Sequence, residues 1–156
     1  MLGKLRNTEI ENLLKTQFIG RIGCYADGVT YVVPVSYIYD GTNIYGFTFE
    51  GMKIDMMRKN SEVCFEVEDT CNLANWQTVI AWGEFRELEG KERNEVLQKL
   101  HSRVLPFISS ETMRVSPLSP FELDNPEDIE GIVFRIRLGK KTGRFEKSTG
   151  SFSYGS

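Results

Sequence analysis

The order of apolar and polar positions along the chain predicts short strands joined by tight turns. Residues 18–25 and 30–39 are dense in apolar, β-branched and aromatic residues, and the turn sequence Ala26-Asp27-Gly28 separates them. Residues 62–68 place their valines and phenylalanine on one face and three glutamates on the other, which is typical of a half-buried strand. Three further runs complete six predicted strands: 43–48, 77–88 and 131–138.

Three segments carry the spacing of helices instead. Residues 8–15 begin with Thr8 and Glu11, the pattern of a capping box, and continue with a short apolar stripe. Residues 51–59 and 91–105 also repeat apolar side chains at helical intervals. We therefore expect three helices beside the strands.

Hairpin-linked strands with few helices predict a mainly β fold, a six-stranded antiparallel barrel with flanking helices. Pro34 cannot donate to a strand ladder, so it should lie at an edge, at a bulge or against a ligand, and Gly83 predicts a bulge or a close approach of another group to the backbone. The chain should form one domain over residues 1–156, with a core of about 8–138. Residues 139–156 are basic and then rich in Gly and Ser, so a flexible tail and a loop at 69–76 are expected.

Composition narrows the classes of function. The 156 residues carry a net charge of −3, so no global basic field favours nucleic acid, and no apolar run is long enough for a membrane span. We expect a cytoplasmic protein, because the first residues lack the apolar core of a signal peptide. Three cysteines without a CxxC pair and a single histidine, His101, argue against a disulfide framework and a metal site.

The stretch Tyr45–Asn60 has the outline of an anion site. A strand ends at Thr48, Gly51 lets a ligand approach the backbone, and Lys53 lies in the first turn of a short helix. Taken alone, this pattern is equally typical of a solvated lysine on a surface helix, and strand–glycine–helix junctions are common.

Three motifs give the chain a family resemblance: YVVPVSY at 31–37, GMKIDMMRKN at 51–60 and WQTVIAWGEF at 76–85. Together they resemble the pyridoxamine phosphate oxidase-like split-barrel proteins that bind flavin mononucleotide (FMN), nearest to the nitroimidazole-resistance branch. The resemblance covers about residues 8–138. It implies a split barrel of the FMN-binding type and a homodimer that holds FMN at the subunit interface.

The resemblance also implies which positions contact the cofactor. One segment would line the isoalloxazine, a second would hold the phosphate, and a third would touch the flavin or its ribityl chain, with Phe47, Trp76 and Trp82 as candidate walls. In that order the segments are Val33, Pro34 and Val35; Thr48, Gly51 and Lys53; and Gln77, Thr78 and Val79.

One position departs from the resistance branch. Phe47 stands where that branch usually has a histidine. A phenylalanine packs or stacks on a flat ring, but it neither ligates iron nor transfers a proton. The resemblance therefore supports a flavin cofactor more strongly than it supports any one reaction.

The predicted function is that of a flavin-dependent oxidoreductase acting on a small planar substrate. In such enzymes the cofactor carries the electrons, and no acid–base group emerges from this sequence, so we assign no catalytic residue. Two alternatives remain open: a non-catalytic flavin-binding module, and a haem-binding or haem-degrading protein with His101 as the ligand.

Overall fold

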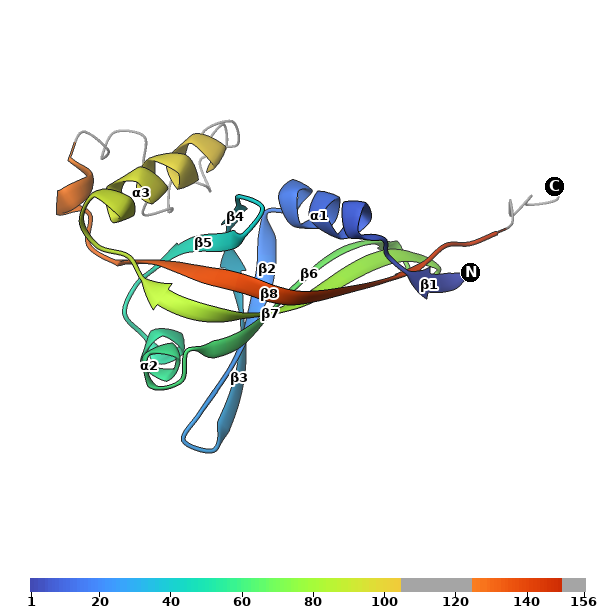
Figure 1. The fold of residues 1–156 in the computed structure, drawn as a ribbon, viewed down its shortest axis with the longest axis horizontal. Coiled ribbons are helices and arrows are strands. Elements are labelled where there is room, and N and C mark those ends of the chain that lie inside the picture. The colour runs from blue at the N-terminus through green and yellow to red at the C-terminus, as the bar shows by residue number, and fades with distance from the viewer. Residues whose placement is uncertain (105–124, 150–156) are drawn as a thin grey trace.

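The strands form one antiparallel sheet in this computed structural model, which describes residues 1–104, apart from the Val104 side chain, and residues 125–149. The strand order is β3-β2-β6-β7-β8-β5-β4, and β1 pairs with β8 (Figure 1). None of the helices in this part of the chain has the length and apolar composition that a bilayer crossing needs. The strands are β1 (Leu2–Lys4), β2 (Ile19–Ala26), β3 (Val29–Ser36), β4 (Ile38–Tyr39), β5 (Asn43–Thr48), β6 (Glu62–Asn72), β7 (Asn75–Glu87) and β8 (Ile132–Glu146), and the helices are α1 (Asn7–Thr16), α2 (Met52–Lys59), α3 (Gly90–Val104) and the short 3-10 helix η3 (Pro126–Asp128).

The sheet curls into a barrel that is split between β3 and β4. These two strands lie at opposite ends of the strand order, yet only Tyr37 separates them in the chain. Tyr37 is buried; its hydroxyl donates to the Leu14 carbonyl oxygen at 2.7 Å, and its ring meets the edge of Phe65 at 4.9 Å. The predicted antiparallel barrel with flanking helices is thus confirmed. Within the described residues it has eight strands rather than the predicted six, because the run at 30–39 breaks at Tyr37 and Leu2–Lys4 adds a strand.

Helices fill and cover the barrel from three sides. α1 and α2 each bury apolar side chains in the main core, including Leu14, Ile54 and Met57, none of which is exposed. Figure 1 shows α1 above the sheet and α2 below it. α3 packs outside the barrel over a second cluster around Leu97 and Tyr45. Burial of these apolar faces supplies most of the stabilisation, as in other domains of this size.

Local backbone features match the sequence pattern at several points. Asp27 and Gly28 have φ of 51° and 78°, so the β2–β3 hairpin turns through two left-handed residues. Pro34 lies on β3, an edge strand, where a missing ladder donor costs nothing. The β7–β8 register shifts between Ala81 and Gly83, which confirms the bulge.

The start of α1 corrects one prediction. The helix begins at Asn7, so Thr8 lies inside the first turn and does not cap it. Arg6 is the residue before the helix, and its backbone N–H donates to Glu9 Oε2 at 2.7 Å. The capping box is therefore formed by Arg6 and Glu9, not by Thr8 and Glu11 as the sequence predicts.

Strands also replace two segments expected to be irregular. β6 runs on to Asn72 and β7 starts at Asn75, so the loop predicted at 69–76 is a tight hairpin. Residues 139–146 continue β8 instead of forming a flexible tail; residues 150–156 lie outside the described part. Gly143 and Phe145 pack against Leu5 and Gly3, and β8 pairs with β7 and β1. The long strands project from the barrel as an arm with β1 at its end (Figure 1).

Candidate functional site

The predicted cofactor residues fall into three places in the fold. The first group lies on the edge strand β3, the second at the end of β5 and the start of α2, and the third on β7. In the described residues, no side-chain hydrogen bond or ion pair joins the second group to the other two. The structure links the first and third groups through the strands between them.

In the first group, strand alternation separates the side chains. Val33 and Val35 point to the inner face, and Val35 is part of the main core. Pro34 is exposed on the outer face and is the register partner of Arg21 on β2. Only Pro34 therefore presents its side chain to a ligand on the outside of the barrel, whereas the two valines offer that side only their backbone.

In the third group, Thr78 is the residue on the outer face. Its hydroxyl donates to Glu66 Oε1 at 3.2 Å, and Glu66 in turn pairs with Arg21 at 3.1 Å. Val79 is fully buried in the core. The chain of contacts from Thr78 through Glu66 to Arg21 reaches the strand beside Pro34, so these side chains share one surface.

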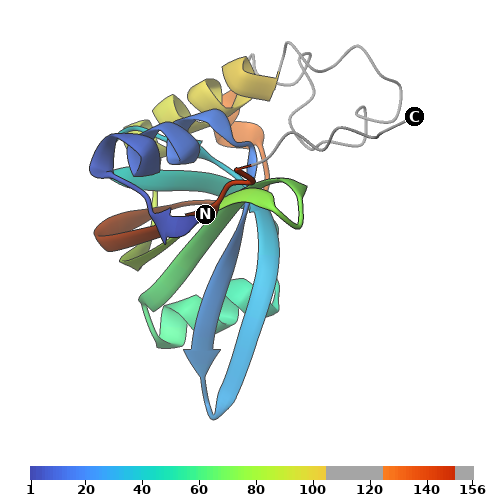
Figure 2. The same cartoon turned by 90° about the vertical axis from the view of Figure 1, so that its right-hand side faces the viewer.

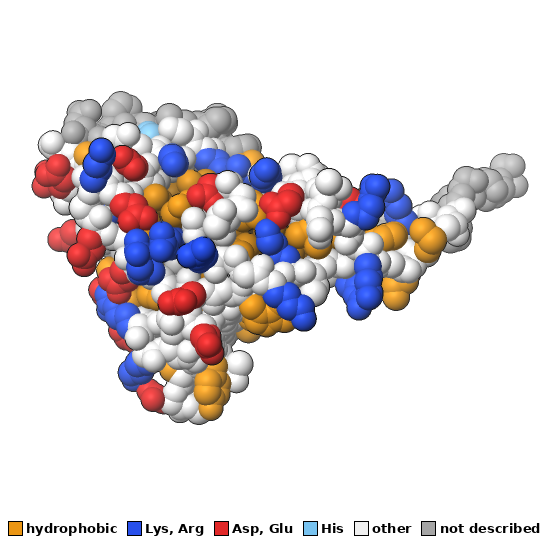
Figure 3. Space-filling model, viewed as in Figure 1, with side chains coloured by type: hydrophobic (Ala, Val, Ile, Leu, Met, Phe, Trp, Pro, Cys, Tyr) orange, Lys and Arg blue, Asp and Glu red, His pale blue; other side chains and the backbone are white. Residues whose placement is uncertain are grey.

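The surface that carries Pro34 and Thr78, called the outer face below, is covered by no helix of the described residues. Figure 2 looks onto it: β2, β3 and β6 run in front and α2 lies behind them. It exposes large apolar side chains, and Figure 3 shows hydrophobic groups along the β2–β3 hairpin and beneath the arm. A sizeable apolar surface rimmed by charges marks an interaction site. The side chains that define the outer face are Ile19, Arg21, Tyr25, Val32, Pro34, Glu66, Thr78, Ile80 and Trp82.

Arg21 and Glu66 are residues of this face that the sequence did not single out. Arg21 also contacts Glu68 at 3.4 Å, so one guanidinium serves two carboxylates. The hydrogen bond and charge of Glu66 raise the pKa of Arg21. Alternation along residues 62–68 predicted a glutamate face, but the partner strand that supplies the arginine is visible only in the fold.

Trp82 lies on the outer face as well. Its side chain is 45% exposed, and the Lys140 amine lies 5.7 Å from the ring centroid. On the sequence, Trp82 is a candidate wall of the cofactor site. Its exposure excludes a core role within the single chain.

Phe47, a candidate wall that precedes the second group on β5, belongs to the packing beneath α3. It contacts the second core cluster and meets Phe49 edge-on at 5.7 Å. Gly131, with φ of 137°, lies directly under the ring, because a Cβ there would approach the Phe47 ring to 2.4 Å. Phe47 is therefore held in place by the second core cluster, Phe49 and Gly131.

The remaining members of this group surround the first turn of α2. Thr48 ends β5, and Gly51 precedes the helix with extended backbone angles. A Cβ added at Gly51 would meet no atom within 4 Å, so the space above it is open. Lys53 is half-buried and pairs with no acidic side chain of the described residues. A helix start with an unpaired amine beside open space suits an anion.

A clamp that the sequence did not reveal fixes the loop before α2. Both Nη atoms of Arg58 donate to the Glu50 carboxylate at 2.7 Å, and Arg58 Nε contacts Glu87 on β7. These bonds lower the pKa of Glu50. The clamp neutralises the carboxylate next to Gly51 and so removes a charge that would repel an anion there.

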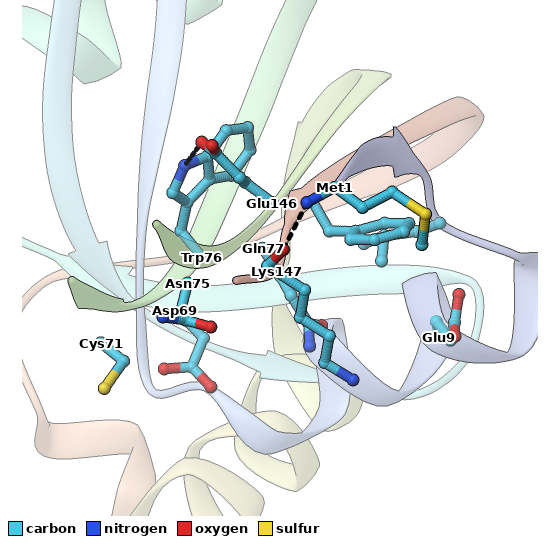
Figure 4. A pocket seen from close by; sticks show the side chains of 11 residues that line it. Met1, Glu9, Asp69, Cys71, Asn75, Trp76, Gln77, Glu146 and Lys147 are labelled. Atoms are coloured by element: carbon cyan, nitrogen blue, oxygen red, sulfur yellow. Dashed lines mark hydrogen bonds between the residues drawn. The ribbon is translucent and has the colours of Figure 1, made fainter. Parts of the chain in front are cut away.

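Gln77 points away from its neighbour Thr78. Its side chain lines a pocket of about 310 Å³ on the inner side of the arm, together with Trp76 (Figure 4). Trp76 Nε1 donates to Glu146 Oε2 at 3.1 Å. Gln77 therefore does not share the outer face with Pro34 and Thr78, whereas the Trp76 side chain leaves β7 on the same side as Thr78, two residues further on.

Metal-binding groups are scarce. The described residues contain no group of three His, Cys, Asp or Glu side chains that could hold a metal ion. His101 is buried on α3, the helix that packs outside the barrel over β5 and β8.

Known proteins resemble the chain over nearly its whole length. Residues 6–144 match the sequence family described as pyridoxamine 5′-phosphate oxidase. An uncharacterised protein of Rhizobium meliloti is 26% identical over 140 residues, which cover 87% of this chain and 89% of the relative.

Solved structures share the fold. A FAD-binding protein of Mesorhizobium loti has a TM-score of 0.72 at 25% identity, over 94% of this chain and 99% of that one. A proposed 5-nitroimidazole antibiotic resistance protein of Bacteroides thetaiotaomicron has a TM-score of 0.67 at 15% identity, over 93% and 87% of the two chains. The second likeness supports the fold alone.

Proposed function

The chain belongs to the pyridoxamine 5′-phosphate oxidase family, and from this we propose that it is a cytoplasmic flavin-binding protein that takes up FMN between two copies. The FMN unit is also half of FAD, the ligand that names the Mesorhizobium loti structure. FMN remains the proposed cofactor because the predicted contacts concern the ring and one phosphate. When bound, a flavin supplies the electron transfer, and the protein orients it and sets its surroundings.

The observation that carries this proposal is the uncovered outer face. A flat ring system needs an apolar surface with a few polar contacts. Trp82 and Ile80 provide exposed apolar area, Pro34 presents no backbone donor, and Thr78 adds a hydroxyl. A second copy placed against this face would exclude water from the ring and would bury side chains that a monomer leaves exposed.

The start of α2 supports the phosphate end of the same proposal. Lys53 supplies a positive charge that no acidic side chain of the described residues neutralises, and Gly51 leaves its backbone N–H open to a ligand. Arg58 contributes indirectly, because it holds Glu50 and the loop in place. The start of α2 lies at the lower side of the barrel in the view of Figure 1. We therefore expect the phosphate at the start of α2 and the flavin ring towards the outer face.

For the reaction, we propose reduction or oxidation of a small planar substrate at the exposed side of the flavin. The competing function, a non-catalytic flavin carrier or sensor, also has an observation in its favour. Arg21 on the outer face is already engaged with Glu66 and Glu68, and Thr78 is hydrogen-bonded to Glu66. These groups position one another, so none of the four is a free acid or base. Turnover with a nicotinamide donor and a quinone or nitro acceptor separates the two functions.

The binding experiment is a titration of flavin-free protein with FMN and, separately, with FAD, followed by quenching of flavin fluorescence. Lys53→Glu places a negative charge beside the phosphate and should raise the dissociation constant for FMN at least tenfold. Lys99→Glu on α3 makes the same charge change at an exposed lysine remote from the site and should leave it unchanged. Equal behaviour of the two variants, or binding of neither flavin by the parent protein, would contradict the proposal.

A further inference from the structure

Two cations lie opposite each other on the outer side of the arm. Lys4 on β1 is the register partner of Arg144 on β8, and Arg144 is the register partner of Thr78 on β7. Register partners send their side chains to the same side of a sheet, so Lys4 and Arg144 lie on the side that carries the Thr78 hydroxyl, with their β-carbons about 5 Å apart. Figure 3 shows Lys and Arg side chains beneath the arm, beside hydrophobic groups. The arm thus extends the outer face with a pair of positive charges.

Neither cation is neutralised by the part of the chain that the structure describes. Lys4 and Arg144 are exposed, and neither forms an ion pair or a side-chain hydrogen bond with a described residue. Arg21, on the same face, instead contacts both Glu66 and Glu68. Like charges directly opposite each other destabilise a pair of strands. A bound anion would remove the repulsion between Lys4 and Arg144.

The two cations lie between two apolar parts of the same face. Trp76 precedes Thr78 on β7 by two residues and Ile80 follows it by two, so each lies about 7 Å from Thr78 along the strand. The Trp76 ring is half-buried, and its Nε1 donates to Glu146 Oε2 at 3.1 Å, which fixes the indole (Figure 4). Ile80 is 38% exposed and belongs to the surface proposed for the flavin ring. A fixed aromatic ring, a pair of cations and the flavin site therefore follow one another along the face.

This order matches the chemistry of a dinucleotide. Two adjacent phosphates carry two negative charges, which complement a guanidinium and an ammonium that lie opposite each other. An adenine can stack on an indole, and its amino group can donate to a carboxylate such as that of Glu146. The FMN phosphate has its own proposed site at the start of α2, which lies apart from the arm in Figure 1. The cations of the arm are therefore available to a second ligand.

We propose that Lys4 and Arg144 bind the pyrophosphate of a nicotinamide dinucleotide, the electron donor of this protein. The adenine stacks on Trp76, and the nicotinamide reaches the flavin site beside Ile80. The proposal rests on the proposed function, because the bound flavin is the electron acceptor. The dihydronicotinamide releases a hydride to the flavin, so the donor is oxidised by two electrons and the flavin is reduced by two. Lys4, Arg144 and Trp76 bind and orient the donor.

Calorimetry with ADP, AMP and adenosine tests the site, on the protein as purified and on protein saturated with FMN. ADP should bind about a hundredfold tighter than adenosine, with AMP between them, because the phosphates contact the two cations. Arg144→Ala and Lys4→Ala should each weaken ADP about tenfold and leave adenosine within about twofold. Arg144→Lys keeps the charge and should stay within about threefold of the parent for ADP. Lys99→Ala, at an exposed lysine on α3, is the control and should change neither ligand.

Two further measurements test the ends of the ligand. Trp76→Leu should weaken ADP and adenosine by the same factor of about five, because both lose the stacking of the base. Oxidised nicotinamide dinucleotide should displace ADP from the parent protein. A failure of this displacement would overturn the assignment of the site to the donor.

Equal affinities for ADP and adenosine, or an unchanged ADP affinity in both alanine variants, would overturn the site. Two other uses of the cations have their own signatures. Arg144→Ala that lowers the affinity for FAD but not for FMN would assign them to FAD, and Arg144→Ala that converts a dimer into monomers would assign them to the subunit interface. Either result overturns the donor site. FMN affinity measured on the same variant should match the parent, so failure of the donor site and failure of flavin binding are separate results.

Discussion

Gly51 is a glycine that the packing of the folded chain does not require but that a bound ligand would. Its φ of 175° is extended backbone open to any residue, and no atom lies within 4 Å of the position that a Cβ would take there. The folded chain therefore gives no steric reason for glycine at this position. A ligand that approaches the backbone gives one.

Gly51→Ala should consequently cost less than about 1 kcal/mol of unfolding free energy, the usual difference between these residues at a helix start. The same substitution should weaken FMN binding, because the methyl group occupies the space above the helix start. Chemical denaturation and fluorescence titration of one preparation check both halves. A stable variant with unchanged FMN affinity would remove Gly51 from the phosphate site.

The orientation of individual side chains in the strands was not predictable from the sequence. The resemblance named runs of three, such as Val33-Pro34-Val35, but a strand sends alternate side chains to opposite faces. Val35 and Val79 are core residues, whereas their neighbours on the outer face are the exposed Pro34 and the half-buried Thr78. The sequence shows that side chains alternate between the two faces of a strand. Which of these faces is buried depends on its pairing with strands that are distant in the chain.

Among the elements, the bulge between β7 and β8 has a clear steric basis. A Cβ at Gly83 would lie 2.4 Å from the backbone oxygen of Arg137, which cannot move without disturbing the ladder. Gly83→Ala should destabilise the protein by about 2 kcal/mol or more. At Gly139, in the same bulge region, the nearest atom to a Cβ is at 3.6 Å, so Gly139→Ala should stay within about 1 kcal/mol of the parent. Equal unfolding midpoints for the two variants would refute the steric explanation.

The turn between β4 and β5 depends on one carboxylate. Asp40 accepts the backbone N–H groups of Thr42 and Asn43 at 2.8 and 2.7 Å and the Tyr45 hydroxyl at 2.9 Å. Partial burial opposes ionisation, but these hydrogen bonds prevail and lower the pKa of Asp40 below its ordinary value of 3.8. A depressed pKa in the folded state stabilises the protein above the unfolded-state pKa, and the gain is lost as the pH falls through the folded-state value.

Asp40→Ala should therefore cost about 1 kcal/mol at neutral pH, since the carboxylate is partly solvated. The difference in unfolding free energy between parent and variant should hold from pH 7 to about pH 5 and shrink below pH 3.8. Urea unfolding at a series of pH values measures it. A difference that stays constant down to about pH 3 would mean that the turn does not depend on the ionised carboxylate.

Element types were easier to predict from the sequence than element lengths. Hairpin turns such as Asp27-Gly28 and the alternation in 62–68 are local signals, and the structure confirms both. The sequence predicts that the last strand ends at residue 138, because the basic residues after it resemble a solvated tail. It continues to Glu146 because β7 and β1 offer backbone partners on both sides, and that pairing is long-range information.

For the whole molecule, the exposed apolar outer face predicts a homodimer. Trp82→Glu and Val32→Glu each place a charge in that face, where the parent side chains are 45% and 62% exposed. Both variants should elute as monomers in light-scattering chromatography, whereas the parent should have about twice the 17.9 kDa mass of one chain. Leu73→Glu, at the tip of the arm, makes the same kind of change outside the face and should remain dimeric. A monomeric parent protein would refute the dimer.

The sequence and its resemblance predicted the antiparallel barrel with flanking helices, and they named Pro34, Thr78 and Lys53 as cofactor contacts, which stay predictions. They could not reveal the Arg21–Glu66–Thr78 contacts, the Arg58 clamp or the pocket behind Gln77. Each of these joins strands or helices that are distant in sequence. The side-chain pattern within one segment can be interpreted from the sequence, whereas contacts between distant segments become visible only in the folded structure.

The central claim is that the protein binds a flavin, and the visible absorption spectrum of the protein as purified tests it most directly. We predict a yellow protein with the two absorption bands of oxidised flavin. Mass spectrometry of the released ligand should identify FMN. A colourless protein that stays colourless after incubation with FMN and with FAD would contradict the account.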